Sequence, residues 1–239
     1  MIFSFNVPLN VTPEQSKRLH ALQIAFAEVC NALVPTVRET RIWNRVTLHH
    51  MTYKALRARF PEIGSQMVCN AIYSVSRSCR MVFQTPGSPF HLSVLGEKPL
   101  PMIRFLDTSP VYFDRHTLSL KAGQISMFTL DGRMRFQLTL KPEDERAFHE
   151  RKLFEITLKR SGDMYLINFC FGDATGAENL LLAAVSVPSQ PQPNVSATAE
   201  MPARVSKDQA HVIPAVTSAR KAPPQAVTLP DYVLIEEAA

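Results

Sequence analysis

The stretch VYFDRHTLSLKAGQISMFTLDGRMRFQLTL, Val111 to Leu140, decides the fold class of this chain. Its apolar residues recur at every second position between turn-forming residues, which predicts strands over Val111–Leu120, Gln124–Leu130 and Arg133–Leu140. The dipeptide Asp131-Gly132 is typical of a two-residue hairpin turn between the last two strands. A small sheet of hairpins is therefore expected in the middle of the chain.

Further strands are expected on both sides of this stretch. At the N-terminus Phe3, Phe5, Val7 and Leu9 alternate with other residues, which predicts a strand with one buried face. The same alternation occurs before and after the central stretch, at Ile103–Leu106, Leu153–Lys159 and Met164–Phe171.

Helices are expected between the first strand and the rest. Thr12, Pro13 and Gln15 form a capping-box pattern, and an apolar stripe follows up to Pro35, where we expect the helix to end. Two more helices are predicted over Thr36–Arg45 and Thr47–Arg59. A fourth begins with Ser65 as its cap, and its apolar seam consists of Val68, Ile72, Val75, Cys79 and Val82.

The order of these elements predicts an α+β protein in which a small antiparallel, OB-like β-barrel is interrupted by a helical bundle. Four segments are expected: residues 1–11 as the first barrel strand, 12–85 as the helical insertion, 86–175 as the rest of the barrel, and 176–239 as a mostly disordered tail. Residues 188–230 carry eight prolines and few aromatic residues, which favours disorder. The final LPDYVLIEEAA could be a docking peptide, but a frayed terminus is the preferred interpretation.

Positive charge is concentrated in the first three quarters of the chain. Residues 1–175 hold 22 of the 26 Lys and Arg residues and 15 of the 21 Asp and Glu residues, a net charge of +7, whereas the remainder carries −2. Between Thr36 and Arg80, eight basic residues face only Glu39 and Glu62. This density predicts a polyanionic partner, whose phosphates would neutralise the charge and release counterions.

The fourth helix carries a polar stripe opposite its apolar seam. Gln and Asn pair with adenine and Arg pairs with guanine in a major groove, so the stripe has the residue types that read bases. An ordinary solvated helix face is the alternative interpretation. The stripe consists of Gln66, Asn70, Tyr73, Arg77 and Arg80.

Two arginines alternate with apolar residues on the last predicted hairpin strand. Arg133 and Arg135 therefore point to one face of the sheet, away from its apolar side. A basic strand face beside a basic helical bundle suits an RNA duplex or a splayed strand. Solvated charges on an edge strand remain the alternative.

Several protein classes are disfavoured by what the sequence lacks. It has no apolar run long enough to cross a bilayer and no signal-peptide pattern, so we expect a cytoplasmic protein without membrane contact. The four cysteines form no C-x-x-C pair, and neither a metal site nor a cofactor is predicted. Phosphate-binding, serine-hydrolase and zinc-protease motifs are absent, so an enzyme is not expected.

The ordered set of motifs resembles the N-terminal half of TnpB (OrfB) proteins, the transposon-encoded, RNA-guided nucleases related to type V CRISPR effectors. The resemblance covers about residues 1–175. It is carried by TPEQSKRLHAL (Thr12–Leu22), LHHMTYKALRARFPEIGSQMVCNAIYSVSRSCR (Leu48–Arg80), VYFDRHTLSL (Val111–Leu120), ISMFTLDGRMRFQL (Ile125–Leu138) and FEITLKRSGDMYLINFCF (Phe154–Phe171).

In that family this half is a wedge barrel with a helical recognition insertion, which binds the guide RNA scaffold and helps read a short motif beside the target DNA. The resemblance implies that Gln66 reads the motif, with Ser65, Asn70 and Arg77 as its neighbours. It places Tyr53 and Lys54 in the adjoining contact region and the strand arginines towards guide RNA. The candidate nucleic-acid-binding residues are Tyr53, Lys54, Arg57, Arg59, Ser65, Gln66, Asn70, Tyr73, Ser74, Arg77, Arg80, Arg133 and Arg135.

The chain departs from the family after its last predicted strand. Family nucleases continue into an RNase H-like domain whose carboxylates hold the catalytic metals, whereas here FGDATGAENLLLAAVSV and a proline-rich tail follow. We therefore expect a nuclease-deficient, nucleoid-associated bacterial module whose partners are guide RNA, target duplex DNA and a separate effector protein recruited through the tail. The alternatives are an RNA-independent DNA-binding regulator, an interaction subunit and a truncated transposon remnant.

Overall fold

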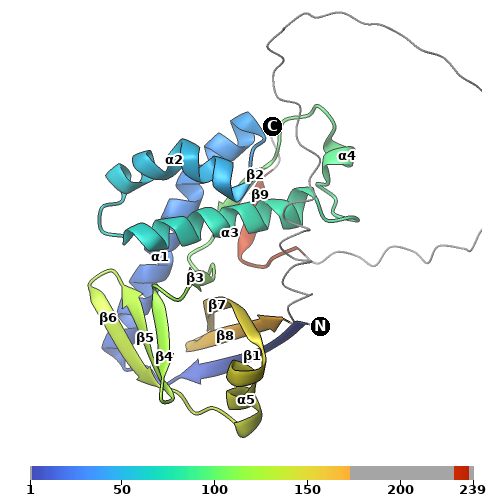
Figure 1. The fold of residues 1–239 in the computed structure, drawn as a ribbon. Helices are drawn as coiled ribbons and strands as arrows, with labels where there is room; N and C mark the ends of the chain where they lie inside the picture. The colour runs from blue at the N-terminus through green and yellow to red at the C-terminus, as the bar shows by residue number, and fades with distance from the viewer. Residues whose placement is uncertain (1, 173–228, 237–239) are drawn as a thin grey trace, which may run out of the picture.

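The computed structural model describes residues 2–172 and 229–236, and within them the chain has a mixed α+β fold with antiparallel sheets (Figure 1). The helices are α1 (Pro13–Thr40), α2 (Arg45–Arg59), α3 (Ser65–Phe83), α4 (Leu92–Leu95) and α5 (Pro142–Glu150). The strands are β1 (Ile2–Leu9), β2 (Met102–Phe105), β3 (Val111–Phe113), β4 (Leu118–Lys121), β5 (Gln124–Thr129), β6 (Gly132–Gln137), β7 (Lys152–Ser161), β8 (Met164–Gly172) and β9 (Val233–Glu236).

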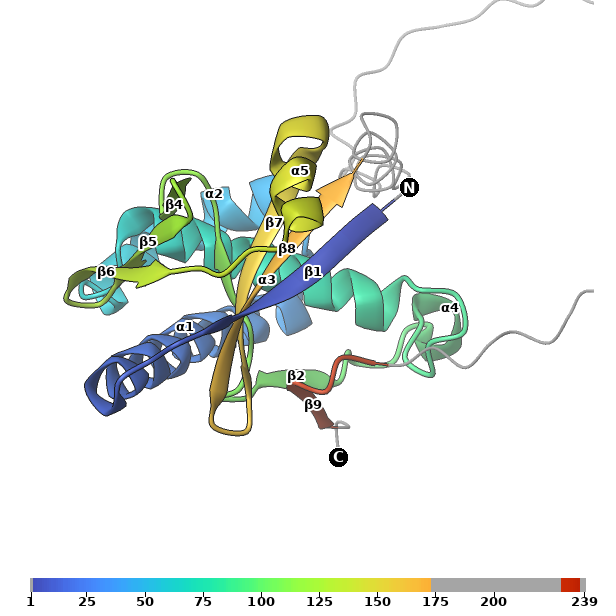
Figure 2. The ribbon, with the colours of Figure 1, turned by 90° about the horizontal axis from the view of Figure 1, so that it is seen from below.

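The largest sheet has four strands in the order β1-β8-β7-β3. The N-terminal strand pairs with β8 along its whole length, from Ile2 opposite Gly172 to Leu9 opposite Tyr165, so it is integral to this sheet. Helix α5 lies against this sheet (Figure 2), where Phe148 packs its ring edge-on against Phe169 at a centroid distance of 5.0 Å. Such an aromatic cluster explains why this short helix is held beside the sheet.

The predicted strand Val111–Leu120 is wrong, because it is two strands in different sheets. The side chain of Asp114 interrupts it by accepting hydrogen bonds from the backbone N–H groups of His116 and Thr117, each at 3.0 Å. This Asx turn redirects the chain, so β3 joins the four-stranded sheet while β4 joins β5 and β6. The described strands consequently form three separate sheets, and the expected closed barrel is not found among them.

The predicted hairpin between β5 and β6 is confirmed, with its turn one residue earlier than expected. Thr129 pairs with Gly132, so the two turn residues are Leu130 and Asp131. Gly132 opens β6 with a φ of +110°, a conformation that side chains with a Cβ rarely adopt.

Helix α1 begins as predicted but continues past Pro35. Both hydrogen bonds of the capping box are present. The backbone N–H of Thr12 donates to the side-chain oxygen of Gln15, and the backbone N–H of Gln15 donates to the hydroxyl oxygen of Thr12. The helix runs through Pro35 to Thr40, and its C-cap is Arg41, whose φ is +56°. Val34 and Val37, on either side of the proline, are buried in the core, and their packing compensates for the backbone hydrogen bond that proline cannot donate. The separate helix predicted over Thr36–Arg45 is therefore wrong.

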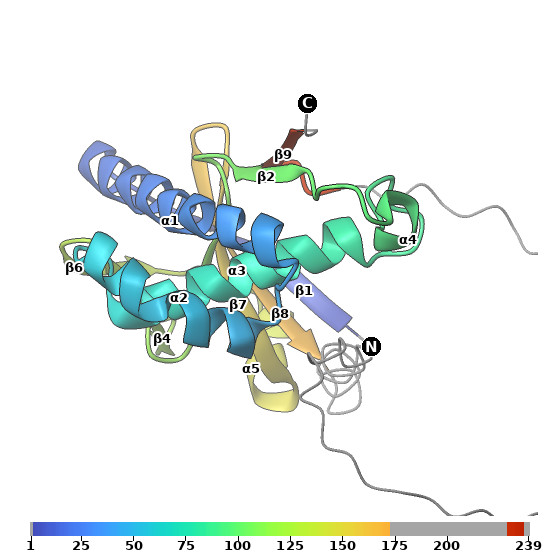
Figure 3. The same cartoon turned by 90° about the horizontal axis from the view of Figure 1, so that it is seen from above.

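The apolar seam of α3 is confirmed. Its residues Val68, Ile72 and Val75 are completely buried, and α3 packs against α1 and α2 in one helical layer (Figure 3). The N-cap is Gly64, so the prediction that Ser65 caps this helix is wrong, and Ser65 is instead its first residue.

The C-terminal end contradicts the prediction of a frayed terminus. Strand β9 pairs antiparallel with β2, so residues 233–236 belong to the folded body. Residues 176–228 of the predicted tail lie outside the described residues. Within the described ranges, no helix is both long and apolar enough to cross a membrane.

Candidate nucleic-acid interface

The loop Asp114–Thr117 connects the first turns of α3 to the end of β3. The side-chain amide of Gln66 donates a hydrogen bond to Asp114 Oδ2 over 2.6 Å. Asn70, one turn later, donates from Nδ2 to the backbone oxygen of Tyr112 over 3.0 Å and lies 3.4 Å from Thr117 Oγ1. Asn70 is only 5% exposed. Its amide therefore holds the loop against the helix, and only Gln66 of this pair has partial access to solvent.

The same loop contacts Arg133 of β6, one of the two strand arginines predicted to bind nucleic acid. Arg133 donates to the backbone oxygen of His116 over 3.2 Å and to that of Ser126 over 2.9 Å. Its guanidinium carbon also lies 4.2 Å from the ring centroid of Phe128, a cation–π contact. Gln66 and Arg133, although far apart in the sequence, are thus bonded to the same loop.

A cleft of about 1090 Å³ opens beside this loop. It lies between the loop, β4, α5 and the four-stranded sheet, and its lining includes Phe113 and Phe148 together with Arg115, His116 and His149. Apolar walls with a few polar groups are typical of ligand sites. Gln66 lies at this cleft, so the residue that the sequence predicts to read a base is beside a space that could accept one.

The middle of the polar stripe of α3 packs against the four-stranded sheet, so an ordinary solvated helix face is the wrong interpretation for Tyr73 and Arg77. Glu155 of β7 lies 3.4 Å from Arg77 and accepts a hydrogen bond from the hydroxyl of Tyr73 over 3.1 Å. Burial acts to lower the pKa of Arg77, but the combined effect of Glu155 and of the nearby tyrosines Tyr112, Tyr73 and Tyr232 outweighs it, so that pKa is raised. Burial also raises the pKa of Tyr73, and Glu155 raises it further.

Three other residues of α3 that were predicted to bind nucleic acid differ in their exposure to solvent. Ser74 is buried and lies in the interior. Arg80 is partly buried, with Nε 3.4 Å from the backbone oxygen of Ser76, and burial lowers its pKa. Ser65 is exposed in the first turn of the helix, beside Gln66. Ser65 is therefore the most accessible of the predicted residues on α3, whereas Gln66, Arg77 and Arg80 are partly buried.

Helix α2 contributes a second basic surface. It contains Arg45, Lys54, Arg57 and Arg59 and no carboxylate. Lys54 and Arg59 are exposed, whereas Arg57 donates to the backbone oxygens of Phe60 and Ile63 and so fixes the connection from α2 to α3.

An aromatic pair lies on the same helix. Tyr53 is half-buried and stacks on the ring of His49 at a centroid distance of 4.7 Å. Arg45, at the start of α2, lies over the ring of Tyr73 on α3 at 5.2 Å. The contact of Arg45 with Tyr73 joins α2 to α3, while Lys54 and Arg59 of α2 remain exposed.

The sequence reasoning missed the loop itself. Asp114, Arg115, His116 and Thr117 were treated as part of one strand. The signal was present, because an Asp followed three residues later by Thr is typical of a turn in which side chains bond the local backbone. Arg115 and His116 between them are exposed, and both line the cleft.

Four exposed basic side chains lie on α2, on the loop beside the cleft and on β6. Lys54, Arg59, Arg115 and Arg135 are exposed, and none of them takes part in the ion pairs among the described residues. In the same residues, no three His, Cys, Asp or Glu side chains are grouped so that they could hold a metal ion. In comparisons with known proteins, no family model matches this chain and no curated protein matches it.

Proposed function

We propose that this protein is a nucleic-acid-binding module that grips RNA and contributes to the recognition of a short DNA motif, without a nuclease site of its own. One observation carries the proposal: the Asp114–Thr117 loop, which lines a large cleft together with Gln66, is hydrogen-bonded both to Gln66 and to Arg133. Amide and guanidinium groups read bases, while exposed arginines and lysines neutralise phosphates.

The resemblance of residues 1–175 to the N-terminal half of TnpB proteins supports the same proposal. In this interpretation, α1–α3 correspond to the recognition insertion and the described sheets to the wedge. The RNA would be a guide scaffold, and the cutting activity would come from a separate effector protein.

The geometry narrows the proposed contact residues. Asn70, Ser74 and Arg77 are committed to contacts inside the protein, so we assign them to holding α3 in place. The proposed contacts are the accessible groups at the cleft, on α2 and on β6, namely Gln66, Arg115, Lys54, Arg59, Arg133 and Arg135.

The test is to purify the full chain at low ionic strength and to sequence the nucleic acid that remains bound. We expect one defined RNA, which is lost on RNase treatment and not on DNase treatment. The double variant Arg59→Glu/Arg135→Glu should lose it, whereas Lys98→Glu/Lys152→Glu, with the same change in charge at exposed positions outside the proposed contacts, should retain it. A protein consistently free of nucleic acid, or equal losses in both variants, would contradict the proposal.

A second candidate is a DNA-binding regulator that works without RNA. The observation that favours it is the basic side of α2, which is exposed over much of the helix and contains no carboxylate. Sequence-selective binding of duplex DNA that survives RNase treatment would support this function. Failure to retard any duplex would remove it.

A further inference from the structure

Strand β9 pairs with β2, and its alternation of apolar and exposed side chains matches the two faces of that strand. In β9, Val233 and Ile235 lie on the same face as Ile103 and Phe105 of β2, and Val233 is only 7% exposed. Leu234 and Glu236 point to the other face, where Leu234 is 48% exposed and Glu236 lies 3.8 Å from Arg104. The alternation of apolar and exposed residues in Val-Leu-Ile-Glu is thus matched to the strand that receives it.

The two edges of β2 have different hydrogen-bonding partners, and only one edge pairs with another strand. Its other edge is held by α1, because the side chain of Asn31 accepts a hydrogen bond from Phe105 N over 2.7 Å and donates one to Phe105 O over 2.9 Å. On the free edge, the backbone oxygen of Tyr232 accepts hydrogen bonds from Leu106 N at 3.1 Å and from Ser109 Oγ at 3.0 Å. Backbone pairing of this kind is how extended peptides add to a sheet edge.

The docked segment also lies near Tyr112, which packs against Tyr73 of α3. Burial raises the pKa of Tyr112, and the nearby hydroxyl of Tyr232 and carboxylate of Glu155 raise it further. Tyr112 packs edge-on against Tyr73 at a centroid distance of 5.4 Å. The C-terminal segment therefore borders the residues that hold Arg77.

The contact is small for the length of chain that it orders. Of β9, only Val233 is buried, and the Arg104–Glu236 pair is exposed on both sides and so adds little. Ordering the residues from Leu229 to Glu236 costs backbone and side-chain entropy at each position. Backbone hydrogen bonds, the buried Val233 and the partial burial of Leu229, Tyr232 and Ile235 offset that cost. Since only one of these side chains is fully buried, the docked strand is held by a limited contact that can be released.

We propose that the free edge of β2 is a peptide-binding groove and that residues 229–236 of the same molecule are its reversible, tethered occupant. The groove selects an extended segment with the pattern aromatic, apolar, any residue, apolar, which is that of Tyr232 to Ile235. This inference does not depend on the proposed nucleic-acid function, because its test measures strand docking alone.

The first experiment tests docking within one molecule by forming a disulfide in the full chain. Arg104 and Leu234 are directly opposite each other on the exposed face, so the variant Arg104→Cys/Leu234→Cys should cross-link within a monomer under mild oxidation. The control Arg104→Cys/Ile235→Cys places the second thiol on the opposite face and should cross-link at least fivefold more slowly. Both variants keep the native cysteines, so peptide mapping assigns the bond. Equal rates, or cross-linked dimers alone, would overturn the proposal.

The second experiment tests reversibility with a synthetic peptide of residues 229–239. The tether gives the resident segment an effective concentration on the order of millimolar. Several millimolar peptide should therefore slow cross-linking of Arg104→Cys/Leu234→Cys by at least twofold, and the same peptide with Val233→Asp should not. A rate unchanged by the unmodified peptide would overturn the idea of an exchangeable groove.

Discussion

Gln66 Nε2 lies 2.6 Å from Asp114 Oδ2, so the residue that the sequence predicts to read a base is itself held by a loop carboxylate. Asp114 also accepts hydrogen bonds from the N–H groups of His116 and Thr117, which makes it a shared anchor for the helix and the turn. The amide of Gln66 is therefore pre-oriented, and less side-chain entropy is lost when it contacts a ligand.

The first prediction concerns the specificity contributed by Gln66. In Gln66→Ala, the preference for the recovered target sequence over single-base variants should fall by roughly tenfold, because one bidentate base contact is worth about 1–3 kcal/mol. Affinity for unrelated nucleic acid should change by less than about twofold. Fluorescence anisotropy with the recovered sequence and its variants measures both quantities.

The matched control for this variant is Gln84→Ala, at the C-terminal end of the same helix. It should leave the preference intact. If both substitutions reduce it equally, Gln66 has no special part in reading the sequence.

The second prediction concerns phosphate contacts. Arg59→Ala and Arg135→Ala should each lower the affinity for RNA and reduce the slope of log affinity against log salt by about one unit, as expected for one lost phosphate contact. Lys98→Ala, also at an exposed position, should leave the slope unchanged. Slopes that stay the same in both arginine variants would exclude these two side chains from the interface.

The third prediction separates stability from binding at Arg77. Glu155→Gln should lower the free energy of unfolding by about 2 kcal/mol, because it leaves the partly buried guanidinium of Arg77 without its carboxylate. Adding Arg77→Met to that variant should cost less than the sum of the two single changes, since no charge then remains unpaired. Urea unfolding of the three variants measures the coupling, and strictly additive effects would show that the pair does not interact.

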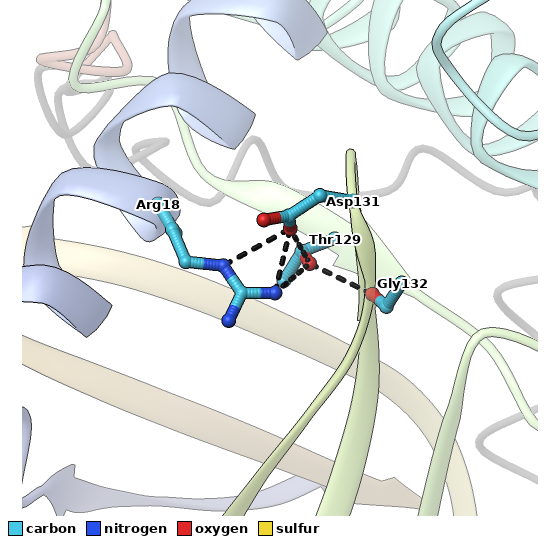
Figure 4. A network of polar contacts seen from close by, with 4 residues as sticks. All are labelled: Arg18, Thr129, Asp131 and Gly132. Atoms are coloured by element: carbon cyan, nitrogen blue, oxygen red, sulfur yellow. Dashed lines mark hydrogen bonds and ion pairs between the residues drawn. The ribbon is translucent and has the colours of Figure 1, made fainter.

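The fourth prediction is a pH dependence at the contact between α1 and the β5–β6 turn, which is shown in Figure 4. Arg18 Nη2 lies 2.6 Å from Asp131 Oδ1, and Thr129 Oγ1 donates to the same oxygen over 2.8 Å. The hydrogen bonds from Arg18 and Thr129 lower the pKa of Asp131 from its ordinary value of 3.8. The folded state therefore favours the ionised carboxylate, so its contribution to stability is full above pH 3.8 and is lost as the pH falls through the lower folded pKa.

Arg18→Met should accordingly destabilise the protein slightly near neutral pH and less in acid. Thermal unfolding from pH 7 to pH 2.5 measures the difference from the unmodified protein. Lys17→Met, at the neighbouring exposed position, is the control and should show no such convergence with pH. A difference that is constant over the whole range would contradict the role of Asp131.

Local patterns in the sequence determined most of the helices and strands. The capping box at Thr12 and Gln15, the buried seam of α3 and the alternation in β1 and β6 were predicted correctly because each depends on residues a few positions apart. The concentration of basic residues was also visible in the sequence, since charge does not depend on the fold.

Only the tertiary structure decided where these elements turn and what they face. Pro35 stays inside α1 because its neighbours Val34 and Val37 are buried in the core, and Asp114 divides a predicted strand because its side chain accepts hydrogen bonds from the backbone of its own turn. The carboxylate opposite Arg77 comes from Glu155, more than seventy positions away, and Val233 finds β2 across an even larger separation. Periodicity specifies which face of an element is apolar, whereas the partner of each polar face depends on long-range contacts that no local pattern encodes.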